Sequence, residues 1–426
     1  MKTKTHSKKP IISILIGSGF SIPAGIPGVK EINKRLSKID ESEIIIHSQM
    51  SAGFLNGQTD NNRLHRNDER LFVQEFIKFY NSLQSVESFH YETFYDFYWD
   101  YRRGIANKDL IDRFIIKFNN DQFPTQEPTI SASQRIDDFN RTFNQLIAQL
   151  IQKSWLYEDI SYLDFPPYDY FIRFLRHLLF GCDIKVHSLN HDLLFEYIGT
   201  KHADLWEFFS DGFELAGSPF YGHAECVFNP NTEHKVKKGY FVKLPRYTGK
   251  YNTPLCLYKL HGNIATHIVY PDHENSPIRI KRTYGIGQYY QELYNSSKGE
   301  YELKHLWDMV QPDFLTGTTE KTRHYSNDPF YKEMFNCFET NLQMSDFLIV
   351  IGYGFQDTGI NNFIEDNYLS KGKAMAYIDP NKPENEILIK YPSTHIQKSI
   401  TEVSIQEYNN LTPNWIIEQC DEAKNK

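Results

Sequence analysis

The sequence lacks the cysteine spacing of a disulfide-stapled or zinc-bound protein. Its five cysteines stand singly, and no Cys-x-x-Cys pair occurs among the 426 residues. An odd number of separated cysteines is typical of a reducing compartment, and a thiolate zinc site needs closely spaced ligands. We therefore expect neither a disulfide framework nor a bound metal.

Long hydrophobic runs and an excess of positive charge are missing as well. The longest apolar runs, such as residues 347–351, are far too short to cross a bilayer. The basic N-terminal residues lead into neither the apolar core nor the cleavage site of a signal peptide. The formal net charge is −8, which removes an overall attraction to nucleic acid. These features predict a cytoplasmic protein that contacts no membrane and binds no nucleic acid directly.

Aromatic residues, in contrast, are abundant: the chain has 28 Tyr and 31 Phe. Such side chains bury large areas, so we expect an aromatic core and aromatic subunit interfaces. Between about residues 44 and 165, aromatic and aliphatic residues recur at helical spacing, with a loop expected at 119–133. We interpret this stretch as a helical insertion whose aromatics serve packing, and whose size fits a lid or an oligomer contact.

Outside this stretch, short apolar runs alternate with helical patterns. We expect strands at 11–16, 183–189, 255–260, 347–351 and 374–378, and helices at 29–36, 168–180 and 331–342. Continuous apolar runs bounded by glycine are typical of strands buried on both faces. The alternation predicts an α/β protein with a Rossmann-like, doubly wound, mostly parallel sheet. We expect one domain over 1–426, interrupted by the helical insertion.

Glycine or polar residues follow each expected strand. They are Gly17-Ser18-Gly19, Asn190-His191-Asp192, His261-Gly262, Gly352-Tyr353-Gly354 and Asp379-Pro380. In open parallel sheets, ligands bind beyond the carboxyl ends of the strands. These residues, far apart in sequence, are therefore expected along one edge of the sheet.

Each strand end also has a simpler interpretation. Residues 17–19 could cradle a phosphate or form only a tight turn, and the third glycine of the usual dinucleotide fingerprint is missing. Asp192 could be a site residue or could cap the following helix. The glycines at 352–354 and the Asp379-Pro380 pair could be plain turns.

The histidines need the same care. A lone histidine after a strand is more often structural, and only the neighbouring motifs favour His261 as a functional residue. His187 and His191 have no such support, so we interpret them as structural.

Four motifs occur in one order along the chain: GSGFSIPAGIP (17–27), SLNHD (188–192), KLHG (259–262) and VIGYGFQD (350–357). The first resembles the G-A-G-x-S-x-x-x-G-I-P motif of the sirtuin superfamily, the second its T-x-N-x-D motif and the third its His-Gly motif. The fourth is similar to the segment that follows the next sheet strand in bacterial sirtuin-like proteins. The resemblance extends from about residue 11 to 379 and implies a sirtuin-like NAD-binding domain.

The resemblance implies a binding role for two segments of the first motif. The loop that contacts the phosphates and ribose of NAD is matched by Gly17, Ser18, Gly19 and Ser21. The segment that lines the nicotinamide side is matched by Gly25, Ile26 and Pro27.

The later motifs match the remaining parts of the site. Asn190 and Asp192 match the polar pair near the nicotinamide ribose, and His261 matches the catalytic histidine. Gly352 and Asp357 match the loop over the distal ribose, and Asp379 stands where a strand-end residue can bind the adenosine end.

Two departures separate this chain from sirtuin deacylases. Those enzymes usually continue G-I-P with Asp-Phe-Arg, whereas this chain has Gly28-Val29-Lys30, and it lacks their four-cysteine zinc module. Both differences put protein deacylation in doubt and leave NAD binding and glycosidic cleavage in place. The pattern is closer to bacterial sirtuin-like NAD hydrolases of anti-phage defence.

Cleavage of the nicotinamide–ribose bond requires few groups. An oxocarbenium-like ribose forms, so the site must stabilise positive charge and hold a water. His261 is suited to accept a proton from a ribose hydroxyl or from water. Asn190 can orient the water or the ribose, and Asp192 can orient a partner or stabilise the cationic ribose.

The sequence therefore predicts an NAD+ hydrolase that releases nicotinamide and ADP-ribose, with NAD+ as substrate. The resemblance further implies a triggered, NAD-depleting effector that forms a homo-oligomer and is activated by a partner such as a HerA-type ATPase or an Argonaute. Two alternatives stay open: a deacylase or ADP-ribosyltransferase, and a non-catalytic sensor of NAD or ADP-ribose.

Overall fold

A seven-stranded sheet lies at the centre of the structure, a computed structural model. It describes residues 9–48, 51–54, 67–83, 89–122, 131–152, 168–228, 236–271, 277–282, 286–306, 311–314, 328–381 and 384–425. The strands run in the order β18-β17-β16-β1-β4-β10-β5, and every neighbouring pair is parallel. Their bounds are β1 (Ile11–Ile16), β4 (Asp183–Ser188), β5 (Phe209–Ser210), β10 (Leu255–Lys259), β16 (Phe347–Ile351), β17 (Met375–Ile378) and β18 (Ser393–Ile396).

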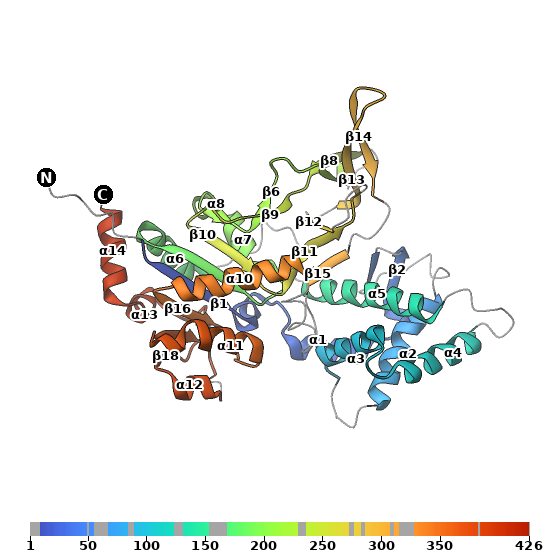
Figure 1. Cartoon of the computed structure of the whole chain (residues 1–426), viewed down its shortest axis with the longest axis horizontal. Helices are drawn as coiled ribbons and strands as arrows, with labels where there is room; N and C mark the ends of the chain where they lie inside the picture. The colour runs from blue at the N-terminus through green and yellow to red at the C-terminus, as the bar shows by residue number, and fades with distance from the viewer. Residues whose placement is uncertain are drawn as a thin grey trace.

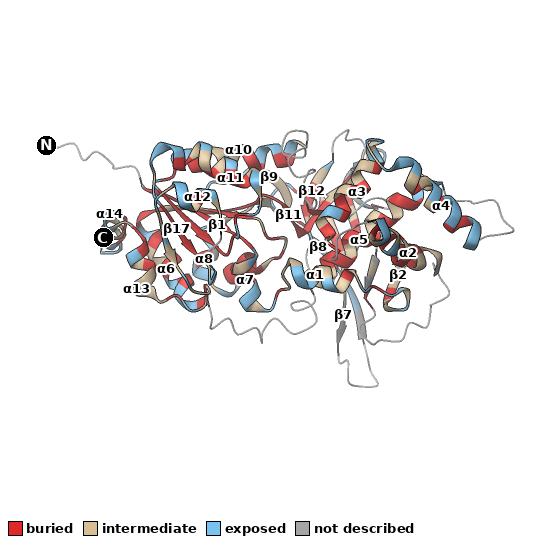
Figure 2. Cartoon of the chain, turned by 90° about the horizontal axis from the view of Figure 1, so that it is seen from below, coloured by how far each residue is buried: buried red, intermediate tan, exposed pale blue. Residues whose placement is uncertain are grey.

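The strands of this sheet are buried because helices cover both of its faces. All residues of β1, β10, β16 and β17 are buried, as Figure 2 shows for the middle of the sheet. Ile12 and Ile14 of β1 join one apolar cluster with α6 (Asp169–Gly181), whereas Leu15 joins another with α10 (Pro329–Met344). Alternate side chains of a strand point to opposite faces. The predicted Rossmann-like, doubly wound sheet is confirmed.

Further helices surround the sheet and its loops. They are η1 (Ser18–Phe20), η2 (Ile22–Ala24), α1 (Val29–Leu36), η3 (Glu41–Glu43), α7 (Leu194–Lys201), α8 (Ala203–Trp206), α11 (Thr358–Asn367), η6 (Leu369–Lys371), α12 (Glu386–Lys390), α13 (Ile405–Leu411) and α14 (Asn414–Lys424). No helix in the described ranges combines the length and apolarity needed to span a bilayer.

The chain order of the strands creates a switch point beside β1. After β1 the chain forms β4 on one side of it, and it later returns to form β16 on the other side. Ligands of doubly wound proteins bind at such a point, beyond the carboxyl ends of the strands. The loops after β1, β4 and β16 are therefore the natural place for a site.

The stretch that we interpreted as a helical insertion contains four described helices and a hairpin that the sequence did not predict. Its helices are α2 (Asn67–Leu83), α3 (Tyr91–Arg103), α4 (Lys108–Gln122) and α5 (Ala132–Gln152), and the hairpin is β2 (Ile44–Ser48) and β3 (Ser51–Phe54). Its core is aromatic, with Phe76 packed edge-on to Phe139 at 4.9 Å between ring centroids. The loop predicted at 119–133 is wrong at both ends, because 119–122 belong to α4 and α5 begins at 132; 123–130 lie outside the described residues.

Two antiparallel sheets, also not predicted, follow the central part of the chain. The five-stranded sheet contains β6 (Gly212–Glu214), β9 (Arg246–Lys250), β11 (Gly262–Val269), β12 (Ile278–Lys281) and β15 (Gln311–Phe314). The four-stranded sheet contains β7 (Phe220–Phe228), β8 (Val236–Lys243), β13 (Ile286–Asn295) and β14 (Glu300–His305). These sheets and the inserted helices lie at the end of the molecule opposite the two termini (Figure 1).

Candidate active site

A cavity of about 470 Å³ lies where the loops after β1, β4, β10 and β16 meet. Ten of the thirteen predicted site residues line it: Gly17, Ser18, Ser21, Ile26, Pro27, Asn190, Asp192, His261, Gly352 and Asp357. Gly19, Gly25 and Asp379 do not. The residues that four separate strand ends supply therefore converge on one space.

Two glycine loops contact each other at the floor of this cavity. The amide of Gly17 donates to the Ile351 carbonyl and that of Gly19 to the Gly352 carbonyl, both at 2.9 Å. A Cβ atom on Gly17 would lie 2.5 Å from the Gly352 oxygen, and one on Gly352 would lie 2.4 Å from the Gly19 carbonyl carbon. Glycine is required here because two backbones are in contact. Gly19 therefore serves loop packing, without lining the cavity.

Glycine at position 25 is explained by its backbone conformation. It ends η2 with a φ of 80°, in the left-handed region that glycine enters without strain, and a Cβ there would meet open space. The structure thus gives Gly25 a turn and does not bring it to the cavity.

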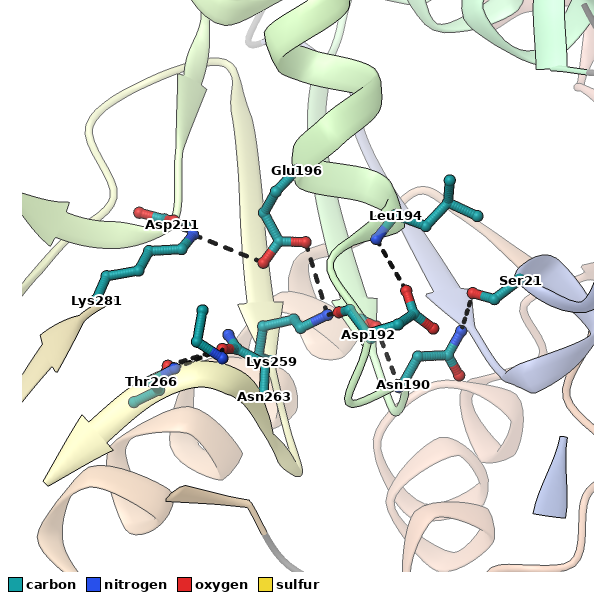
Figure 3. A network of polar contacts seen from close by, with 12 residues as sticks. Ser21, Asn190, Asp192, Leu194, Glu196, Asp211, Lys259, Asn263, Thr266 and Lys281 are labelled. Carbon is teal, nitrogen blue, oxygen red and sulfur yellow. Dashed lines mark hydrogen bonds and ion pairs between the residues drawn. The ribbon is translucent and has the colours of Figure 1, made fainter. Parts of the chain in front are cut away.

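Asn190 ties the end of β4 to the loop after β1. Its Nδ2 donates to the Gly17 carbonyl at 2.9 Å. The same nitrogen donates to the Ser21 hydroxyl, also at 2.9 Å (Figure 3). Because both amide hydrogens are used, Oδ1 is the atom of this side chain that can accept a hydrogen bond from a ligand.

Asp192 combines the two roles that the sequence left open. Its Oδ1 accepts from the amide of Leu194, the first residue of α7, at 2.9 Å, and its side chain also lines the cavity. Burial raises the pKa of this carboxyl, whereas Lys259, the Leu194 amide and the Ser21 hydroxyl lower it.

His261 lies beside a carboxylate that the sequence assigned elsewhere. Its Nε2 is 3.7 Å from Oδ2 of Asp357, and the imidazole is buried at 4% exposure. Asp357 in turn accepts at Oδ1 from the Ile360 amide at 3.1 Å, which fixes the carboxylate at the start of α11. The two side chains are thus close enough for an ion pair when the imidazole is charged, without a direct hydrogen bond.

His191 was interpreted as structural, yet it lines the cavity. Its ring lies 6.2 Å from that of His261 and 5.0 Å from Phe314, measured between centroids. Its place between Asn190 and Asp192, in the loop that follows β4, was the signal that could have identified it.

His187 and Asp379 stay outside the site. His187 stacks on Tyr258 with centroids 5.1 Å apart, and complete burial lowers its pKa to about 3. Oδ1 of Asp379 accepts from the Asn381 amide at 2.8 Å, as in the simple turn that the sequence also allowed. The structure does not bring Asp379 into the cavity.

The insertion supplies part of the cavity wall, which its sequence did not reveal. Tyr91, Glu92 and Ile151 line the cavity. The amide of Tyr91 donates to Oδ1 of Asn33 at 2.9 Å, so the start of α3 is fastened to α1. The aromatic insertion is therefore more than packing.

Charge in the cavity is acidic. Three carboxylates line it, from Glu92, Asp192 and Asp357, and none of its described lining residues is Lys or Arg. Such a lining favours a ligand with a cationic part. Within the described ranges, no three His, Cys, Asp or Glu side chains gather as a metal site requires.

Comparison with known proteins gives no family model and no curated protein that matches this chain. Among solved structures, a Sir2 homologue in complex with NAD aligns at 9% identity and a TM-score of 0.33, covering 98% of this chain and 91% of that one. A mutant Sir2 homologue in complex with ADP-ribose aligns at 9% identity and a TM-score of 0.36, covering 99% and 95%. The fold described above rests on this chain's own strand order and pairing.

Proposed function

We propose that this chain is an NAD+ hydrolase that cleaves the nicotinamide–ribose bond and releases nicotinamide and ADP-ribose. One observation carries the proposal: Asn190, Asp192 and His261 line the same cavity as the loop that begins at Gly17. A space of about 470 Å³ is within the usual range for small-molecule sites. The sirtuin-like order of the four motifs supports NAD+ as the ligand.

The charges of the cavity support one orientation of the substrate. NAD+ carries an anionic pyrophosphate and a cationic nicotinamide ring. The pyrophosphate fits the part of the cavity that Gly17 and Ser18 line, where the backbone leaves space for it and the Ser18 hydroxyl can donate to it. The ring fits the acidic side, near Asp192 and Glu92, where opposite charges attract.

The reaction needs an oriented water and a stabilised cationic ribose. Nicotinamide leaves as a neutral molecule because its ring nitrogen takes the electron pair of the broken bond. Water then forms the new bond to the ribose carbon, and its released proton passes to His261. Asp357 stabilises the imidazolium, Oδ1 of Asn190 accepts from a ribose hydroxyl or the water, and Asp192 stabilises the developing positive charge.

The biological setting comes from the resemblance alone. It supports a triggered, NAD-depleting effector of anti-phage defence that works as a homo-oligomer and is activated by a HerA-type ATPase. The assay is therefore run with and without such a partner.

The test is nicotinamide release from NAD+ by the full chain. Wild type should release nicotinamide, and His261→Ala and Asn190→Ala should lose about a hundredfold or more of the rate. His305→Ala is the control, because His305 ends β14 and does not line the cavity. Equal rates of nicotinamide release in all four proteins would contradict the assignment of this cavity as the active site. Binding of NAD+ without turnover under every trigger would favour the alternative of a non-catalytic NAD sensor. An acyl-peptide assay separates a deacylase.

A further inference from the structure

Four charged side chains, those of Lys259, Glu196, Lys281 and Asp211, lie in a row next to Asp192, and the first two are buried (Figure 3). Lys259 Nζ is 3.7 Å from Oε2 of Glu196, and Lys281 Nζ is 3.6 Å from Oε1 of the same carboxylate. Lys281 also pairs with Asp211. The side chains of Lys259 and Glu196 are each 7% exposed, so water hydrates and screens neither charge effectively. Buried charges of this kind are tolerated only when they compensate one another.

Lys259 connects this row to the candidate active site. Its Nζ donates to the backbone carbonyl of Asp192 at 2.5 Å. Lys259 is the last residue of β10, paired with Ser188 at the end of β4, and it stands two residues before His261. A single ammonium thus holds the backbone between two strands whose ends carry site residues.

The positive charge of the same ammonium also influences the carboxylate of Asp192. Removal from water raises the pKa of Asp192, and Lys259 is the largest opposing influence. The Leu194 amide and the Ser21 hydroxyl also stabilise the ionised form of Asp192. Glu196, which is like-charged, and Tyr168, which is neutral, are close to it as well. Glu196 disfavours the Asp192 charge by repulsion, and its two lysine neighbours counter that effect.

We propose that Lys259 is a positioning residue of the site, which holds the backbone of residues 190–192 and keeps the buried carboxylate of Asp192 ionised. Glu196 fixes the ammonium in that place. The inference rests on the proposed function for its catalytic meaning, because an ionised Asp192 stabilises the cationic ribose. The alternative is that Lys259 only contributes a buried ion pair to the core.

The test measures conformational stability against pH, which does not depend on turnover. Lys259→Met removes the ammonium, and Lys259→Gln keeps a hydrogen-bond donor without the charge. A carboxyl whose pKa is raised in the folded state loses stability as pH rises through that pKa. Both variants should therefore lose more stability between pH 4 and pH 8 than wild type. Adding Asp192→Asn to either should remove most of this extra loss.

Activity provides the second readout. In wild type, nicotinamide release should fall on the acid side as Asp192 takes up a proton. In Lys259→Met or Lys259→Gln, this acid limb should move to higher pH by about one unit or more, the usual effect of losing a nearby opposite charge, and the rate below the limb should fall about tenfold. The inference would be overturned if a folded, active Lys259 variant kept the acid limb of wild type and also had the same pH-dependent stability as the double mutant that adds Asp192→Asn. Absence of nicotinamide release by wild type would instead overturn the proposed function, and the stability measurement would still decide the role of Lys259.

Discussion

Gly352 offers a sharp test of how the two glycine loops form the cavity floor. Its φ is 60°, and a Cβ there would lie 2.4 Å from both the Gly19 carbonyl carbon and the Phe20 nitrogen. These are backbone atoms, held by hydrogen bonds between the two loops, so neither can move aside as a flexible side chain could. Alanine at 352 must therefore push the loops apart.

The magnitude follows from two contributions. Left-handed backbone costs a residue with a Cβ about 1–2 kcal/mol. Forcing extra volume into a packed contact costs about 1–3 kcal/mol more. Gly352→Ala should thus lower the free energy of unfolding by about 2–5 kcal/mol, a large share of the roughly 5–15 kcal/mol of a typical protein.

Urea unfolding at pH 7 measures the loss, with Gly354→Ala as the matched control. At Gly354 the closest atom to an added Cβ would be Cγ of Gln356 at 3.8 Å, an ordinary contact. That variant should stay within about 1 kcal/mol of wild type. The affinity for ADP-ribose should also fall in Gly352→Ala, because the displaced loops line the cavity. A Gly352→Ala protein as stable as Gly354→Ala would refute the packing argument.

Three further predictions concern charge. Glu92→Gln, made on a His261→Ala background to stop turnover, should weaken NAD+ binding by about 1 kcal/mol, because only NAD+ has the cationic ring. ADP-ribose binding should be unchanged. Calorimetry that shows equal losses of affinity for the two ligands would count against the proposed orientation of NAD+. The pKa of His187 is about 3 in the folded protein and near 6.5 in the unfolded chain, so the free energy of unfolding should fall by about 1.4 kcal/mol per pH unit as pH drops below 6.5. Urea titrations at several pH values measure this dependence, and a His187→Gln protein with the same pH dependence as wild type would disprove the prediction. Asp68→Ala should lower the free energy of unfolding by about 3 kcal/mol, because it leaves the buried Arg135 without its 2.7 Å ion pair. A loss below about 1 kcal/mol in urea unfolding would show that Arg135 finds another partner.

The parallel sheet could be predicted because its strands are buried on both faces. Such strands are continuous apolar runs, and the runs at 11–16 and 347–351 coincide with β1 and β16. The residues that follow them could be gathered into one site because the carboxyl ends of parallel strands share an edge.

The antiparallel sheets could not be found in the same way. β14 reads EYELKH and is largely exposed, whereas β11 reads GNIATHIV and is buried along most of its length. β14 does alternate polar and apolar residues over 300–304, and that alternation was a signal that could have identified it. β11 lacks the strict alternation that identifies a half-buried strand, since burial of both its faces depends on segments distant in sequence. The sequence pattern within such a strand does not show which distant segments cover it in the folded protein.

The pairing of His261 with Asp357 was missed for a related reason. These residues follow β10 and β16, which are separated by β1 and β4 in the sheet. The contact depends on how far the loop after β16 reaches across the sheet edge, and loop reach is not a property of periodicity. The approach of Glu92 has the same origin, because the docking of α3 on α1 through Asn33 is a tertiary contact.

The most direct measurement of the central claim follows both products of NAD+ at once. The full chain, with and without an activating partner, is incubated with NAD+ and the mixture is resolved by chromatography. We expect nicotinamide and ADP-ribose in equal amounts from wild type, and neither from His261→Ala. NAD+ that stays intact while bound, or nicotinamide without matching free ADP-ribose, would contradict hydrolysis at this site.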